Sequence, residues 1–233
     1  MKSLTVLVPI YNESRTLTEL VSQIDSMLSG VIAECIFIND GSTDNSGEVL
    51  AAALAQVSFK HQTLTQPNGG KSSAIKAGAK LVQSSHVIIL DADLELDTHD
   101  VVELWKVVQD GKADVVFGYR HFLAQSAFTY RYAKGNLVIS NLYGLLFNEV
   151  VTDIMCGYKL VPTKVLQDLP YKFKKFAIEI EIPIYLWKQR IRPHEVKVGY
   201  SPRSRLDGKM ISAKDAVAII FTLITHRILK ARR

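Results

Sequence analysis

A chain of 233 residues and 26.0 kDa is long enough for one domain with a large core and too short for two full domains. Its composition, with 48% hydrophobic and 22% charged residues, indicates a globular protein. The net charge of +5 favours anionic partners. Nucleic acid is not expected among them, because the sequence has no zinc-binding spacing, no aromatic RNA-stacking motif and no basic helix-turn-helix pattern.

The cysteine content and the apolar runs predict the compartment. Two cysteines, Cys35 and Cys156, make a disulfide framework improbable and favour a reducing environment. The first apolar run is too short for the core of a signal peptide. No run reaches the roughly 18 to 20 apolar residues needed to cross a bilayer, the longest candidate being residues 216–225. We therefore expect a cytoplasmic protein without an integral membrane segment.

The first half of the chain alternates short apolar strands with helices. Strands are predicted at residues 4–10, 35–39, 60–65, 87–91 and 113–118, with helices between them at 14–28, 44–57, 70–83 and about 98–109. Strands separated by helices of this length require crossover connections, which are typical of parallel sheets covered on both faces. The fold class is therefore predicted to be α/β, with a doubly wound, mostly parallel sheet.

The regular alternation stops after Arg120. The remaining predicted segments are a long apolar helix at 128–147, core segments at 151–161 and 196–200, a helix at 181–189 and a last helix over about 212–231. The apolar positions of the 128–147 helix cover much of its circumference, so it is either buried or in contact with something other than water. We divide the chain into one domain at 1–211 and a basic, amphipathic helix at 212–233.

Polar side chains follow three of the predicted strands. Tyr11 and Glu13 follow the first strand, Asp40 the second, and Asp91 and Asp93 the fourth. Doubly wound sheets bind their ligands beyond the carboxyl ends of the strands, so these side chains are expected to converge on one site. Taken alone, Asp40 has an ordinary alternative as the cap of the helix that follows it.

Three acids alternate at the end of the fourth predicted strand. Asp91, Asp93 and Glu95 would project to one side if the extended backbone continued beyond the strand. Their mutual repulsion would be relieved by Mg²⁺ or Mn²⁺, which bind oxygen ligands and share their coordination shell with substrate phosphates. The alternative is a solvated acidic turn.

A glycine-rich segment precedes the third predicted helix. Residues 67–73 read Pro-Asn-Gly-Gly-Lys-Ser-Ser and resemble a phosphate-binding turn at a helix N-terminus, with Lys71 as its cation. A Walker A loop would need a glycine at position 65, which is Thr65, so a P-loop NTPase is disfavoured. The alternative is a plain turn that starts the helix.

These motifs together resemble family 2 glycosyltransferases with the GT-A fold, a Rossmann-like three-layer α/β/α architecture. The motifs of that family are Val8-Pro9-Ile10-Tyr11-Asn12-Glu13, Asn39-Asp40-Gly41-Ser42-Thr43-Asp44, Asn68-Gly69-Gly70-Lys71 and Asp91-Ala92-Asp93. Those of the branch with dolichyl-phosphate mannose synthase and bacterial polyprenyl-phosphate sugar transferases are Thr152-Asp153, Cys156-Gly157-Tyr158-Lys159, Glu179-Ile180-Glu181 and the basic segment 203–209. The resemblance covers nearly the whole chain.

The resemblance implies an inverting glycosyltransferase that moves a sugar from a UDP- or GDP-sugar to a polyprenyl phosphate in cell-envelope glycan synthesis. It implies a nucleotide-binding set and a divalent metal, Mg²⁺ or Mn²⁺. Pro9, Tyr11 and Glu13 would contact the base, and Asp40 would contact the base or the ribose. Asp91 and Asp93 would contact the ribose and the metal, with Glu95 as the third metal position. Arg120 and Arg131 would bind the acceptor phosphate, and Lys209, Arg203 or Arg205 would bind the diphosphate. The segment 205–210 lacks the Ser-Lys pair found in many of these enzymes, which leaves open which cation meets the phosphate.

The acceptor type leaves two roles open for Asp153. A lipid phosphate is already an anion, whereas a hydroxyl acceptor needs a general base, which Asp153 could supply. Asp153 could equally be a structural acid, and Glu179 and Glu181 are expected to be structural or loop-ordering acids. The absence of a Gln-x-x-Arg-Trp motif favours the phosphate acceptor. The alternatives are transfer to a hydroxyl of a glycan or glycolipid, a sugar nucleotidyltransferase, and a non-catalytic membrane-associated module.

Two apolar segments bear on a membrane contact. The helix around 137–147 and the segment 216–229, followed by the cations Lys230, Arg232 and Arg233, combine apolar surface with positive charge, as interfacial segments do. We expect a peripheral contact with the cytoplasmic leaflet or with a membrane-protein partner. The alternative is that the two helices pack against each other.

Overall fold

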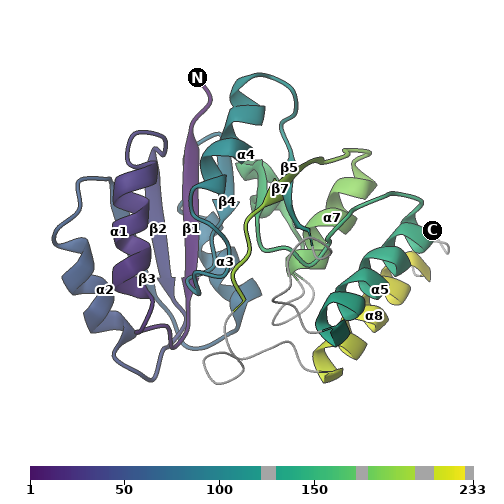
Figure 1. Cartoon of the computed structure of the whole chain (residues 1–233), viewed down its shortest axis with the longest axis horizontal. Helices are drawn as coiled ribbons and strands as arrows, with labels where there is room; N and C mark the ends of the chain where they lie inside the picture. Colours follow the sequence, from purple (N-terminus) through teal and green to yellow (C-terminus); the bar gives the residue numbers. More distant parts are fainter. Residues whose placement is uncertain (122–129, 172–177, 203–212, 229–233) are drawn as a thin grey trace.

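The structure, a computed structural model, describes residues 1–121, 130–171, 178–202 and 213–228 (Figure 1). Its centre is a seven-stranded sheet. The strands lie in the order β3 (His61–Thr65), β2 (Glu34–Asn39), β1 (Leu4–Ile10), β4 (His86–Ile89), β6 (Lys159–Pro162), β5 (Val116–Arg120) and β7 (His194–Val198). Only β6 runs antiparallel to its two neighbours within this sheet. The prediction of a mostly parallel sheet is confirmed.

Helices cover both faces of the sheet, which confirms the three-layer α/β/α architecture (Figure 1). One face packs against α1 (Leu17–Leu28), α2 (Ser46–Leu54) and α4 (Asp100–Gln109). The other packs against α3 (Lys71–Ala79), α5 (Tyr130–Phe147), α6 (Thr163–Asp168), α7 (Ile178–Lys188) and α8 (Ala213–Ile228). The predicted helices are present, with ends shifted by a few residues.

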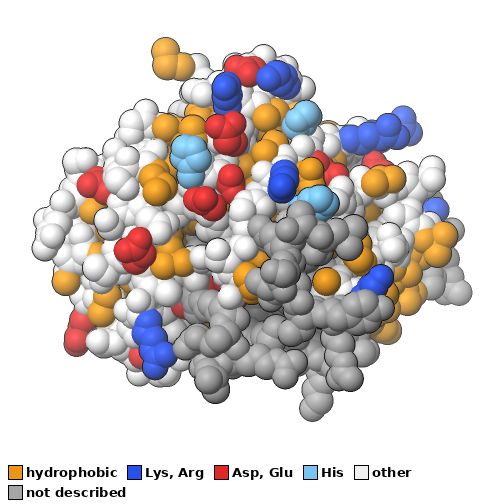
Figure 2. All heavy atoms as spheres, viewed as in Figure 1, with side chains coloured by type: hydrophobic (Ala, Val, Ile, Leu, Met, Phe, Trp, Pro, Cys, Tyr) orange, Lys and Arg blue, Asp and Glu red, His pale blue; other side chains and the backbone are white. Residues whose placement is uncertain are grey.

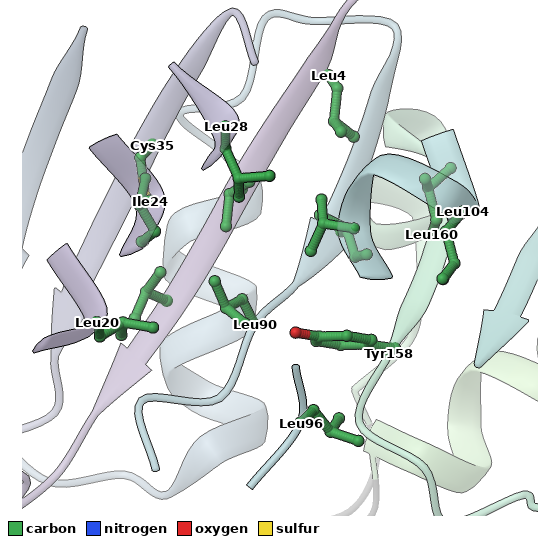
Figure 3. Close-up of a cluster of buried hydrophobic side chains, with 14 of the residues drawn as sticks. Leu4, Leu20, Ile24, Leu28, Cys35, Leu90, Leu96, Leu104, Tyr158 and Leu160 are labelled. Carbon is green, nitrogen blue, oxygen red and sulfur yellow. The ribbon is translucent and has the colours of Figure 1, made fainter. Parts of the chain in front are cut away.

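Alternation along each strand divides the core in two. In β1, Val6 and Val8 join the cluster under α1, while Leu7 joins the cluster under α3, because successive strand side chains point to opposite faces. Figure 3 shows part of the first cluster, with Leu90 and Leu96 near the ring of Tyr158. Burial of each such leucine contributes roughly 1.5–3 kcal/mol to the free energy of unfolding.

The topology brings the polar strand ends together. Strands β2, β1 and β4 are parallel neighbours, so their carboxyl ends lie at the same edge of the sheet. Because β6 is antiparallel to β4, with Leu160 opposite Ile88, the beginning of β6 lies at this edge too. The segment before β6, which contains Asp153 and Gly157, therefore reaches the edge at which β1, β2 and β4 end.

Helices α5 and α8 lie side by side (Figure 1). Buried residues of both helices belong to one hydrophobic cluster, including Tyr143 and Phe147 of α5 and Ile219 and Leu223 of α8. The predicted alternative, packing of these helices against each other, is thus observed. Among the described residues, none of the helices combines the length and apolarity that a membrane crossing requires.

Candidate functional site

The loops after β1 and β2 are joined by hydrogen bonds. Asn12 has a φ of 58°, and its side-chain oxygen accepts from the backbone N–H of Thr43 at 2.7 Å. The backbone N–H of Asn12 donates to the hydroxyl of Ser42 at 3.1 Å. Tyr11, predicted on the base, is 43% exposed in this loop, and Pro9 and Glu13 are partly buried beside it in sequence. Tyr11 and Glu13 therefore belong to one cross-linked pair of loops, and Pro9 lies near the end of β1 beside them in sequence.

Asp40 is buried beneath the glycine-rich loop that precedes α3. It is 3% exposed, and its Oδ1 accepts from Gln66 Nε2 at 2.6 Å and from the Gly69 N–H at 3.0 Å. Its Oδ2 accepts from the Gly70 N–H at 2.7 Å. Amide hydrogen bonds to a carboxylate are among the strong hydrogen bonds of proteins. Asp40 thus holds this loop against the end of β2, and its contact with a base or ribose stays a prediction.

A glycine makes this close approach possible. Gly41 has a φ of +68°, and a Cβ at this position would lie 2.7 Å from the backbone nitrogen of Asn68. A larger residue would strain the backbone and push the glycine-rich loop away.

Lys71 lies between two carboxylates at the start of α3. Its Nζ is 2.6 Å from Asp91 Oδ1 and 2.6 Å from Glu179 Oε1. Burial by itself would lower the pKa of Lys71, but the charges of Asp91 and Glu179 outweigh it and raise this pKa. The predicted phosphate-loop lysine is therefore a charged group that connects α3, the end of β4 and α7.

Gly157 confines Asp91 from the other side. A Cβ at position 157 would collide with Asp91 Oδ2. One oxygen of Asp91 is thus held by Lys71 while the other faces the Cα of Gly157. The carboxylate has little freedom to rotate.

The extended continuation expected for Asp91, Asp93 and Glu95 is wrong. Strand β4 ends at Ile89, and Leu94 takes a φ of 57° that turns the chain. The turn is closed by a hydrogen bond from the Glu95 N–H to Asp93 Oδ1 at 3.1 Å, a local bond that competes with extended structure. Glu95 Oε2 instead accepts from the Tyr200 hydroxyl at 2.8 Å.

Asp91, Asp93 and Glu95 are the residues expected to hold a divalent metal. Carboxylate oxygens suit Mg²⁺ or Mn²⁺. In the part of the chain that the structure describes, however, no three acidic, histidine or cysteine side chains are grouped as a metal site. Glu95 bonds Tyr200 and Asp91 bonds Lys71. The assignment of the three acids to a metal stays a prediction.

Arg120, at the end of β5, forms a buried ion pair with Asp153. Its Nε is 2.6 Å from Asp153 Oδ2, and its Nη2 donates to Oδ1 at 3.0 Å. The guanidinium carbon lies 5.0 Å from the ring centre of Tyr200, which is a cation–π geometry. Asp153 is 1% exposed and both of its oxygens bond Arg120, which favours the structural role among the two left open by the sequence.

Several predicted cations fall outside these observations. Arg203, Arg205 and Lys209 lie outside the described residues, and Arg131 belongs to α5 with a side chain that is not described. Their assignments to the acceptor phosphate and to the diphosphate stay predictions.

The sequence did not predict the contacts that Glu179 and Lys159 make. Glu179 was expected to be a structural or loop-ordering acid, and it pairs with the predicted phosphate-loop lysine across 108 positions of sequence. Lys159 is buried and donates to the carbonyl oxygens of Ile154 and Cys156. The motifs around both residues were visible, but no local pattern shows which distant group each one meets.

Known proteins resemble this chain in sequence and in fold. Residues 5–170 match the family described as Glycosyl transferase family 2. Glycosyltransferase AglJ of Haloferax volcanii is 26% identical over 85% of this chain and 63% of its own length. An undecaprenyl-phosphate 4-deoxy-4-formamido-L-arabinose transferase of Yersinia enterocolitica is 27% identical over 97% of this chain and 67% of its own length. The chain thus spans about two thirds of the length of these two relatives.

A solved structure shares the fold. Glucosyl-3-phosphoglycerate synthase of Mycobacterium tuberculosis, solved with Mn²⁺, UDP and glucosyl-3-phosphoglycerate, superposes with a TM-score of 0.74 at 18% identity. The match covers 97% of this chain and 78% of that one. Because the family model matches residues 5–170, and because the architecture is that of the solved structure, this chain belongs to glycosyl transferase family 2 and is a glycosyltransferase with the GT-A fold.

Proposed function

We propose that this glycosyltransferase moves a sugar, with inversion, from a UDP- or GDP-sugar to the phosphate of a polyprenyl lipid in cell-envelope glycan synthesis. The observation that carries the proposal is the cross-linked set of polar groups at the ends of β1, β2 and β4, which Asp40 and Lys71 connect to α3. The named activity of the Yersinia relative, transfer to undecaprenyl phosphate, supports the acceptor class.

The donor would lie over the loops after β1 and β2. In this proposal Pro9, Tyr11 and Glu13 contact the base and Asp40 the base or ribose. Asp91 and Asp93, with Glu95 as a third candidate, would hold Mg²⁺ or Mn²⁺, whose charge would offset that of the departing nucleoside diphosphate.

The buried ion pair of Asp153 with Arg120 supports a phosphate acceptor over a hydroxyl acceptor. A general base must reach the proton it removes, and both oxygens of Asp153 are bound to Arg120 in a buried pair. A phosphate acceptor needs no such base. Arg120 and Arg131 as acceptor-phosphate residues, and Lys209, Arg203 and Arg205 as diphosphate residues, are part of the same proposal.

A peripheral membrane contact follows from the acceptor. Val138 and Leu145 of α5 and Phe221 and Ile224 of α8 are exposed apolar side chains, and Arg227 follows them on α8. Figure 2 shows hydrophobic side chains at the edge of the molecule where Figure 1 has these two helices. Apolar side chains next to cations suit an anionic lipid surface. Phe221→Ser should reduce co-sedimentation with vesicles of phosphatidylglycerol, whereas unchanged sedimentation would contradict the contact.

The decisive experiment offers the enzyme a panel of nucleotide sugars with undecaprenyl phosphate and Mn²⁺ and detects glycolipid by mass spectrometry. A product that carries one sugar on the lipid phosphate is expected. A product formed only when a hydroxyl acceptor replaces the lipid phosphate would support transfer to a glycan or glycolipid instead. If UDP and GDP with Mn²⁺ both leave the melting temperature unchanged, the donor site itself is wrong.

A further inference from the structure

We propose that Glu179 is a positioning residue of the donor site: it holds the ammonium group of Lys71 and thereby limits how strongly Lys71 neutralises Asp91. The inference deepens the proposed function and rests on its donor site. Nothing in the sequence motif around Glu179 indicates this role, because its partner lies on α3, at the other end of a long-range contact.

The burial of Glu179 shows how strongly it depends on Lys71. Its side chain is 6% exposed, and its Oε2 has no hydrogen-bond partner among the described residues. A buried carboxylate without a counter-charge is strongly unfavourable, so this group requires a nearby cation. The neighbouring buried lysine, Lys159, donates to the carbonyl oxygens of Ile154 and Cys156. Lys71, at 2.6 Å, is therefore the cation that satisfies Glu179 directly.

The geometry divides one ammonium group between two carboxylates. The Lys71 side chain is 14% exposed and Asp91 is 25% exposed, so the Asp91 end of the triad faces the solvent and the Glu179 end is closed. Asp91 keeps part of its negative charge for a ligand because Glu179 shares the lysine. Without Glu179, Lys71 would pair with Asp91 alone and compete with any cation or ribose hydroxyl that binds there.

The test measures ligand binding, not catalysis. Isothermal titration with UDP and with GDP, each in the presence of MnCl₂, compares wild type with Glu179→Gln. Mutation of a group that holds a metal ligand in place typically lowers metal affinity or activity 10–100-fold. The variant should therefore bind the nucleotide, in the presence of Mn²⁺, about 10-fold more weakly. The matched control is Glu34→Gln, which removes another buried carboxylate with a lysine partner, Lys60 at 3.4 Å, at the opposite end of β2. It should leave the dissociation constant unchanged.

A double-mutant cycle separates positioning from a general loss of structure. In a Lys71→Met background, adding Glu179→Gln should weaken nucleotide binding no further, because Glu179 acts through Lys71. If Glu179→Gln does not fold, Glu179→Asp serves in its place and should also weaken binding, since its carboxylate is one methylene shorter.

The outcomes distinguish this inference from the donor site on which it rests. If the wild type binds nucleotide and Glu179→Gln binds equally well, the positioning role is refuted. The same holds if the variant loses affinity equally with and without Lys71. If the wild type binds neither UDP nor GDP, the donor-site proposal fails and this inference fails with it.

Discussion

The loops after β1 and β2 satisfy their polar groups differently from a second region, formed by the end of β5 and the segment before β6. In the first region, the exposed Asn12 and the buried Asp40 accept hydrogen bonds from backbone N–H groups of neighbouring loops. In the second, Arg120 and Asp153 neutralise each other in the interior. The first arrangement fixes loops relative to one another, whereas the second binds both oxygens of Asp153 to one guanidinium group. In the proposed function, the first region binds the donor, and Asp153 in the second has a structural role.

Removal of Asp153 should have the largest effect on stability. Asp153→Ala leaves Arg120 buried without its counter-charge, and breaking a buried ion pair in this way typically costs about 3–5 kcal/mol. Urea unfolding followed by circular dichroism measures the loss. Adding Arg120→Met should restore much of the stability; if it does not, the ion pair is not what Asp153 contributes.

Asp91→Asn tests the donor-side region directly. In the proposed function Asp91 holds the metal ion whose charge offsets that of the departing nucleoside diphosphate. Loss of such stabilisation of developing charge typically lowers the catalytic rate about 10²–10³-fold, and we expect a loss of this size in sugar transfer. The circular dichroism spectrum should be unchanged, because the side chain is isosteric. Activity near that of wild type would remove Asp91 from the chemistry.

Asp40→Asn tests whether the glycine-rich loop depends on a charged acceptor. Hydrogen bonds to charged groups contribute about 1.5–3 kcal/mol to stability. The asparagine side chain can accept hydrogen bonds only through its oxygen, whereas the aspartate accepts through both of its oxygens. We expect a loss of that order in the free energy of unfolding and faster hydrogen exchange at the amides of Gly69 and Gly70. Unchanged exchange at both amides would contradict the role assigned to Asp40.

Gly157→Ala tests the confinement of Asp91. The added methyl group would collide with Asp91 Oδ2 and displace the carboxylate. Since misplacement by about 1 Å can cost up to about 10²-fold in rate, we expect transfer to fall about 10-fold. Gly135→Ala is the control, because a Cβ there would meet nothing within 4 Å. Equal activity of both variants would show that Asp91 tolerates the movement.

The smallest effect is expected from the Cys156 thiol. Burial, together with the charge of Asp153, raises its pKa from 9.0 to about 11. The folded state thus holds this proton more tightly than the unfolded state, so the thiol's contribution to stability is complete below pH 9 and is lost between pH 9 and pH 11. The unfolding free energy of wild type should fall more steeply over this range than that of Cys156→Ala. Parallel pH profiles would contradict the shift.

Much of the fold follows from local patterns. The alternation of apolar strands and helices predicts the three layers, since crossover connections leave few other arrangements. The polar residues after β1, β2 and β4 were predicted to converge, and the parallel order of these strands brings their ends to one edge. The position of β6 was not predicted, because antiparallel pairing with β4 depends on contacts between residues more than 70 positions apart.

The acidic turn shows where local reasoning stops. Alternation of Asp91, Asp93 and Glu95 predicts one side of a strand only if the strand continues, and a hydrogen bond within the turn together with the φ of Leu94 ends it. The partner of Glu95, Tyr200, lies 105 positions later in the chain.

The sequence by itself determined the layered α/β fold, the family and the edge of the sheet at which the site lies, because periodicity and strand-end motifs are local properties of the chain. Only the tertiary structure decided the partners of each charge: Lys71 with Asp91 and Glu179, and Arg120 with Asp153. Charges buried in a folded chain must be paired, and which pair forms depends on the packing of elements far apart in sequence.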